Sequence, residues 1–100
     1  MTDDSFSITA RNLLNRLEEK HGGRIMPTIG NKIRWKAPWP MSKGNTVACL
    51  KHKDGSHSIS ATGKAADVTR EILGEEDEIK SMGVGLTQYS IWKMGGLTSS

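Results

Sequence analysis

Residues 46–61 read TVACLKHKDGSHSISA, and they carry the clearest hairpin signal of the chain. The pair Asp54-Gly55 is typical of a two-residue type I′ turn, whose two central positions both need a positive φ. This turn pairs Leu50 with Ile59, so the two side chains share one face of the hairpin. The same face then carries Ala48, Ala61, His52 and His57, and the opposite face carries Val47, Cys49, Lys51 and Lys53.

A second hairpin precedes it, with Gly30-Asn31 between two segments of alternating apolar residues. A two-residue loop would pair Ile29 with Lys32, whereas a three-residue loop that includes Lys32 pairs Ile29 with Ile33. Only the three-residue loop places every apolar residue on one face, so we expect that register. Pro27 cannot donate a ladder hydrogen bond, so its strand is expected at a sheet edge. The opposite face then collects Arg24, Arg34 and Lys36.

A helix is predicted before the hairpins, over residues 7–21. Ser5 or Ser7 can accept hydrogen bonds from its first free amides, and Gly22-Gly23 ends it. Its apolar stripe follows the helical period and consists of Ala10, Leu13, Leu14 and Leu17.

A second helix is predicted after the hairpins, from Thr62 or Gly63 to Gly74. The acidic residues 75–78 either extend this helix or form a solvated loop. Residues 84–93 alternate in polarity, which predicts a last strand.

These elements predict a two-layer α+β domain. An N-terminal helix, an antiparallel four- to five-stranded meander built from two hairpins, a second helix and a C-terminal strand follow one another. The chain has 100 residues, which allows a single domain over 1–100, with residues 1–6 and 95–100 expected to be flexible. The predicted core consists of Ala10, Leu13, Leu14, Leu17, Ile25, Ile29, Ile33, Trp35, Leu50, Ile59, Val68 and Ile72.

Charge is distributed unevenly along the chain. The formal net charge is +3, but the stretch from Lys20 to Lys64 holds nine Lys and Arg residues against the single acid Asp54. Residues 65–80 hold six acids and two basic residues. The middle of the chain is therefore suited to a polyanionic partner, and the acidic stretch is not.

Several classes of protein are excluded by the composition. Cys49 is the only cysteine, so a disulfide-stapled secreted domain is excluded. No apolar run reaches the ~20 residues of a membrane helix, and the N-terminus lacks the basic start and apolar run of a signal peptide. The sequence predicts a soluble cytoplasmic protein without a membrane partner.

A small hydrolase or metal enzyme built around His52, His57 and Asp54 is the third and least favoured hypothesis. Zinc needs three or four ligands, and beyond His52 and His57 the candidate donors are His21 and Cys49, which lies on the other face. The turn accounts for Asp54, and a thiol within a strand is usually an inert apolar group. We therefore expect no enzyme, metal or cofactor.

The preferred hypothesis is a small non-enzymatic nucleic-acid-binding or accessory protein. Lys and Arg neutralise phosphates and an aromatic ring can stack on a base, so a basic sheet face would track the backbone of DNA or RNA. The element order over residues 46–73 resembles the second half of a double-stranded-RNA-binding domain. Of that family's lysine cluster at the second helix, Lys64 alone is matched, and Asp67 follows it. The candidate binding residues are Arg24, Arg34, Lys36, Trp39, Lys51, Lys53 and Lys64.

The alternative hypothesis is a protein-binding modulator or inhibitor of a larger assembly. Trp and Met are enriched at the centres of protein interfaces. Trp92 and Met94 are the candidate partner-binding residues, and they would also serve a homodimer.

Overall fold

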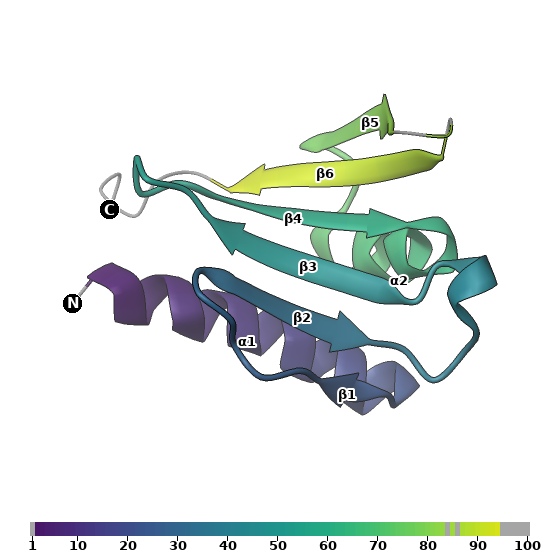
Figure 1. Ribbon diagram of the computed structural model, residues 1–100, viewed down its shortest axis with the longest axis horizontal. Helices are drawn as coiled ribbons and strands as arrows, with labels where there is room; N and C mark the ends of the chain where they lie inside the picture. Colours follow the sequence, from purple (N-terminus) through teal and green to yellow (C-terminus); the bar gives the residue numbers. More distant parts are fainter. Residues whose placement is uncertain (1, 84, 86, 95–100) are drawn as a thin grey trace.

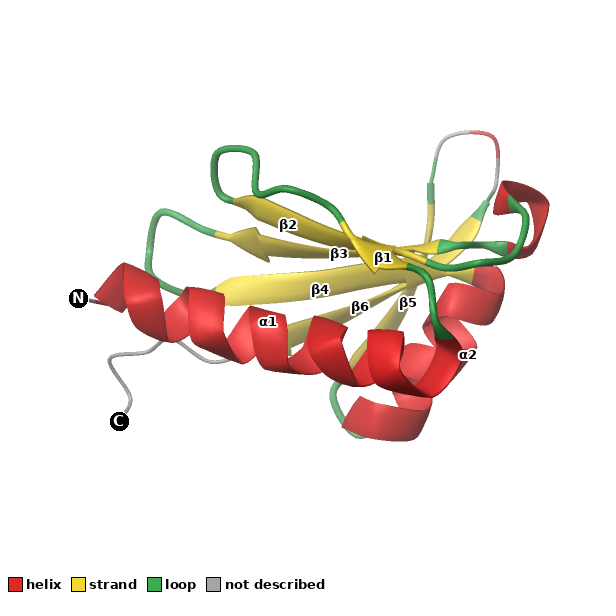
Figure 2. Cartoon of the chain, turned by 90° about the horizontal axis from the view of Figure 1, so that it is seen from below, coloured by secondary structure: helices red, strands yellow, loops and turns green. Residues whose placement is uncertain are grey.

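Two helices cover one face of a six-stranded antiparallel sheet, and neither helix covers the other face (Figure 2). The computed structural model describes residues 2–83, 85 and 87–94, with side chains described from Ala10 to Lys93 within those ranges. The sheet order is β1-β2-β3-β4-β6-β5 (Figure 1). The elements are α1 (Thr2–His21), β1 (Arg24–Ile25), β2 (Lys32–Lys36), the 3-10 turn η1 (Met41–Lys43), β3 (Thr46–Lys51), β4 (His57–Thr62), α2 (Gly63–Leu73), β5 (Glu78–Met82) and β6 (Gln88–Met94).

The predicted α+β class is confirmed, together with both helices and both hairpins. The sheet has one strand more than predicted, because residues 78–82 form β5 at its far edge. Gly74 ends α2 with a φ of 83° and its N–H donates to the Arg70 carbonyl, so the acidic run does not extend the helix. The strand order is also not that of a meander, since β6 lies between β4 and β5.

The β3–β4 hairpin has a wider loop than predicted. The N–H of His52 donates to the Ser56 carbonyl over 2.8 Å, and Lys51 pairs with His57, so three residues form the loop. Asp54 favours this loop because its Oδ1 accepts hydrogen bonds from the N–H and Oγ of Ser56. The predicted two-residue register is therefore wrong. The side chains of β3 lie on the opposite faces from those predicted, whereas Ile59 and Ala61 of β4 stay on the core side. Val47, Cys49, Ile59 and Ala61 share the buried face, and Leu50 and Ala48 lie on the uncovered one.

The β1–β2 hairpin also departs from the predicted three-residue loop. Ile29 bridges to Lys32, which is the two-residue loop, and Ile25 pairs with Trp35. Between these two pairs the first segment has one residue more than β2, so the chain bulges. Ile25 thereby keeps its place on the core side while Ile29 is left 65% exposed, and β1 shrinks to two residues at the sheet edge.

Helix α1 begins at Thr2, so Ser5 and Ser7 lie within it instead of capping it. It ends at His21, as Gly22-Gly23 predicted. The predicted flexible tail 95–100 lies outside the described residues. Ile29 and Leu50 are wrong as core predictions, and Ile25 and Ile72 pack at the margin of the core. The largest fully buried side chains are Trp35, Trp92, Leu14, Leu17, Ile33 and Val47.

A buried ion pair fastens β5 to α2. The guanidinium of Arg70 donates to both Glu78 carboxylate oxygens over 2.6 and 2.7 Å, and Ser90 Oγ donates to the same carboxylate. The Glu78 side chain is only 2% exposed. The hydrogen bonds from Arg70 lower its pKa to about 2. Glu78 is therefore a structural residue. In the part of the chain that the structure describes, no helix is long and apolar enough to span a membrane.

Candidate nucleic-acid interface

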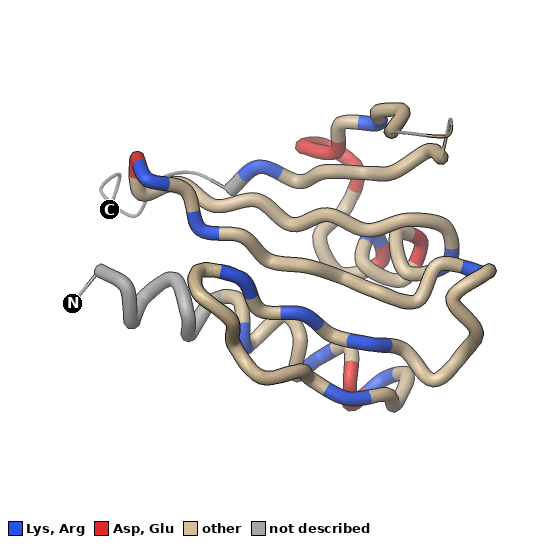
Figure 3. The backbone as a smooth tube through the Cα atoms, viewed as in Figure 1, with Lys and Arg blue, Asp and Glu red and all other residues tan. Residues whose placement is uncertain are grey.

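The face of the sheet without helices carries a row of cations. Cross-strand partners share a face, so Lys32, Arg34 and Lys36 of β2 lie on this side together with Arg24 of β1, the partner of Lys36. None of the four forms an ion pair with a carboxylate of the described residues. Figure 3 shows Lys and Arg following β1 and β2, whereas Asp and Glu lie on the helices, in the β3–β4 loop and on the segment that leads to β5. We call these four residues the cation row.

Among the described strand residues, Lys93 is the only charged one on the rest of this face. Small and hydroxyl-bearing residues of β3 and β4 lie next to the cation row, and larger residues of β6 and β5 follow. None of the described strands places an Asp or Glu on this face, because Glu78 of β5 points toward α2. The residues beyond the cation row are Thr46, Ala48, Leu50, Ser58, Ser60, Thr62, Tyr89, Ile91, Lys93, Ile79 and Ser81.

A shallow trough of about 420 Å³ runs over the middle of this face. Its floor is formed by β3 and β4, where the short side chains of Ala48, Ser58 and Ser60 leave room. Tyr89 and Ile91 of β6 form the wall opposite the cation row. We call this feature the central trough.

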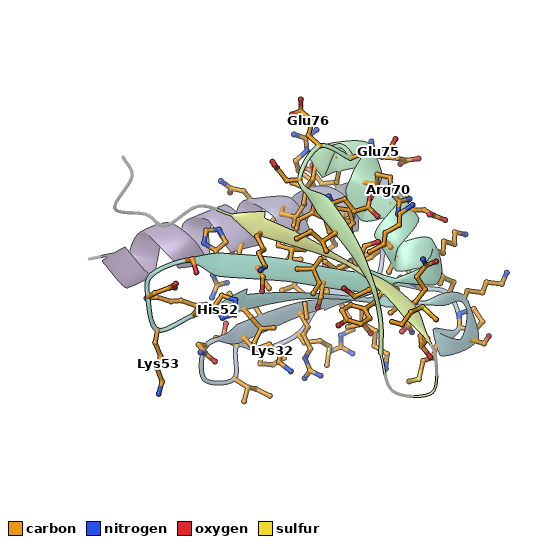
Figure 4. All side chains as sticks on the ribbon, turned by 90° about the horizontal axis from the view of Figure 1, so that it is seen from above. Lys32, His52, Lys53, Arg70, Glu75 and Glu76 are labelled. Carbon is orange, nitrogen blue, oxygen red and sulfur yellow. The ribbon has the colours of Figure 1, made fainter. Side chains whose placement is uncertain are left out.

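Lys51 and Lys53 do not join the cation row as predicted. Lys51 pairs with His57 and points to the helix-covered side, because the three-residue loop exchanges the two faces. Lys53 is exposed in the hairpin loop. Figure 4 shows Lys53 and Lys32 pointing away from the helices. Lys32 was not among the predicted binding residues, because the expected three-residue loop included it; the two-residue alternative pairs it with Ile29.

Trp39 and Lys64 meet each other, but on the helix-covered side. The Trp39 ring packs edge-on against Trp35 with 5.8 Å between centroids, and its Nε1 donates to the Gly44 carbonyl over 2.7 Å. Lys64 Nζ lies 4.4 Å from the centre of the Trp39 ring. Trp39 is thus engaged in the margin of the core, apart from the cation row. The Trp39 ring is therefore not placed on the uncovered face, where it could stack on a base.

Trp92 is 1% exposed, and its Nε1 donates to the Gly74 carbonyl over 2.9 Å. The Trp92 side chain is therefore not on the surface, where the partner-binding prediction needs it, because it pairs with Ile59 of β4 on the core side of the sheet. The side chain of Met94 lies outside the described residues. The hypothesis of a protein-binding modulator can therefore no longer use Trp92 as a surface contact.

The two histidines of the hairpin do not face each other. His52 Nε2 lies 2.9 Å from Ser58 Oγ on the uncovered side, and His57 is 4% exposed on the other side. Burial, followed by the charge of His52, lowers the pKa of His57. Burial also raises the pKa of the Cys49 thiol to about 12, which keeps it protonated. Across the described ranges, no three His, Cys, Asp or Glu side chains gather closely enough to hold a metal ion.

The arrangement can bind an extended anion, since the cation row offers positive charge along one side of an uncharged trough. Comparison of the chain with protein-family models, with curated proteins and with solved structures finds no match in any of the three.

Proposed function

We propose that the protein binds nucleic acid without sequence specificity through the uncovered face of its sheet. The observation that carries the proposal is the cation row: four neighbouring Lys and Arg side chains, without a described carboxylate partner, on a face to which the described strands contribute no acid. Phosphates along a nucleic-acid backbone provide the matching negative charge.

A solvated outer face is the ordinary role of alternating polar residues in an antiparallel sheet, and edge lysines also prevent sheets from associating. Such a face usually mixes both signs of charge. Here the acids lie on the helices, in the β3–β4 loop and on the approach to β5 (Figure 3), whereas the cations of β1 and β2 share the uncovered face. This separation of charge favours a polyanionic ligand over mere solubility.

The packing of the two helices supports low sequence specificity. Helices α1 and α2 both pack against the sheet, so neither projects into a nucleic-acid groove to read base edges (Figure 2). Contacts with phosphates make the affinity fall steeply with salt. Four such contacts give a slope of about −3 in a plot of log affinity against log salt concentration.

A pair of matched double variants tests the proposal. Arg34→Ala with Lys36→Ala removes two cations from the row, and Arg16→Ala with Lys20→Ala removes the same two residue types from exposed positions of α1. We expect the first variant to weaken binding of a labelled oligonucleotide about 10-fold or more and to reduce the salt slope by about 1.5, while the second changes little. Equal loss in both variants, or wild-type affinity no better than millimolar at low salt, would refute the proposal.

A further inference from the structure

We infer that the central trough receives unpaired bases, so that the ligand of the uncovered face is a single strand and not a duplex. This inference rests on the proposed function and adds the class of nucleic acid to it. It is carried by the position of the trough beside the cation row and by the chemistry of its lining.

The spacing of the strands places the trough within reach of a nucleotide whose phosphate lies on the cation row. Arg34, Ala48 and Ser60 lie on one cross-strand line from β2 to β4. Neighbouring strands are about 4.8 Å apart, so the middle of the trough is about 5 to 10 Å from the cation row. A base that extends sideways from a phosphate bound at Arg34 would therefore lie over Ala48 and Ser60.

The lining of the trough suits a base better than a phosphate. None of the described residues that line it is charged, so they offer a phosphate no counterion there. Leu50 and Ile91 offer apolar surface to the face of a ring. The hydroxyl groups of Ser60 and Thr62 can donate to or accept from the polar edge of a base, and Thr46 Oγ1, which donates to Asn45, can still accept.

Tyr89 adds an aromatic ring to the trough. It is half-buried in β6 and lies over Gly83, where even a Cβ atom would approach its Cε1 to 3.3 Å. Aromatic side chains in an open sheet are the usual platforms on which the bases of single strands stack. Gly83 therefore leaves the space in which this ring sits at the wall of the trough.

A duplex cannot use this surface in the same way. Its bases are paired and stacked inside the helix, so its phosphates could contact the cation row while the trough remains empty. A single strand offers both phosphates and free bases. The two features together should favour the single strand.

The experiment compares three ligands with wild-type protein at low salt. They are a thymine oligonucleotide of about 12 nucleotides, an abasic oligonucleotide with the same number of phosphates, and a duplex of the same length. We expect the thymine strand to bind about 10-fold or more tightly than either of the others. The abasic strand isolates the bases, because it keeps the charge and flexibility of the backbone.

Three variants locate the preference in the trough. Tyr89→Ala should lose about 5- to 100-fold in affinity for the thymine strand and little for the abasic one, whereas Tyr89→Phe keeps the ring and should bind like the wild type. Ser60→Leu fills the floor of the trough and should have the same selective effect, which keeps the test valid if Tyr89→Ala does not fold. Thermal unfolding of each variant reports whether it is folded.

The outcomes separate the inference from the proposed function. Equal affinity for all three ligands, with a loss in every case when Arg34 and Lys36 are replaced, would overturn the inference and leave the proposed function standing. Binding of none of the three at low salt would overturn both. A preference for the thymine strand that survives in both Tyr89→Ala and Ser60→Leu would also overturn the assignment to the trough.

Discussion

At the β5 end of the sheet, Arg70 lies between the carboxylates of Glu78 and Asp67, whereas at the β1–β2 end the cation row has no carboxylate partner among the described residues. Figure 4 shows Arg70, Glu75 and Glu76 on the helix side, and Lys32 and Lys53 on the opposite side. Charge that is paired inside the molecule stabilises the fold. Charge left unpaired on a rigid strand remains available to a ligand. Four predictions test this contrast.

Removal of the buried carboxylate should have the largest effect on stability. Glu78→Ala leaves the half-buried guanidinium of Arg70 without its bidentate partner, and we expect the free energy of unfolding to fall by about 3 kcal/mol in urea titrations. Glu76→Ala is the matched control, because Glu76 is an exposed acid near the same turn, and it should change stability by less than about 0.5 kcal/mol. Similar losses in both variants would show that the buried pair has no special role.

The same carboxylate should make the free energy of unfolding depend on pH in the acidic range. Its pKa is lowered to about 2 in the folded protein from an ordinary 4.5, so its contribution is complete above the unfolded value and is lost as the pH falls through this range. We expect the wild type to lose about 2 kcal/mol more than Glu78→Gln across that window. Unfolding curves recorded at several pH values check this. Parallel pH profiles for the two proteins would contradict it.

Lys64 is an intermediate case, since its partner is an aromatic ring instead of a carboxylate. Lys64→Ala removes the cation above Trp39, and we expect a loss of about 0.5 to 1 kcal/mol in the free energy of unfolding. Lys64→Arg keeps a cation at this position and should restore most of the loss. An unchanged stability in Lys64→Ala would mean that the contact contributes nothing.

The cation row should contribute least to the fold. Arg34→Ala with Lys36→Ala removes no ion pair of the described residues, so we expect the free energy of unfolding to change by less than about 0.5 kcal/mol. Relief of repulsion between neighbouring cations could even raise it at low salt. A loss as large as that of Glu78→Ala would assign the row a structural role and weaken its assignment to a ligand.

The two helices could be predicted from sequence because their apolar residues repeat at the helical period and glycines mark their ends. The hairpin registers could not, since they depend on loop geometry that a short motif does not determine. Asp54-Gly55 fits a two-residue turn, yet the hydrogen bonds from Ser56 to Asp54 stabilise a three-residue loop. That one difference misplaced Leu50 and Lys51.

Strand β5 and the burial of Trp92 could not be predicted for a different reason. A run of four acids is usually solvated, and nothing local distinguishes Glu78 from its neighbours. Its partner Arg70 lies eight residues earlier, in α2, and the pair forms only when β5 folds back beside that helix. Trp92 is likewise buried through pairings of β6 with β4 and β5, which are contacts between distant parts of the chain.

The pairing of β3 with β4 also limits which insertions and deletions the loop between them can accept. Strand residues point alternately to the two faces, so a one-residue slip in the pairing of β3 with β4 would move the side chains of β3 to the opposite face. Val47 would then face a partner from the uncovered side, and the Cys49 thiol would lose its cover. A change in the length of this loop should therefore be tolerated only where the loop or a bulge absorbs it without shifting that pairing.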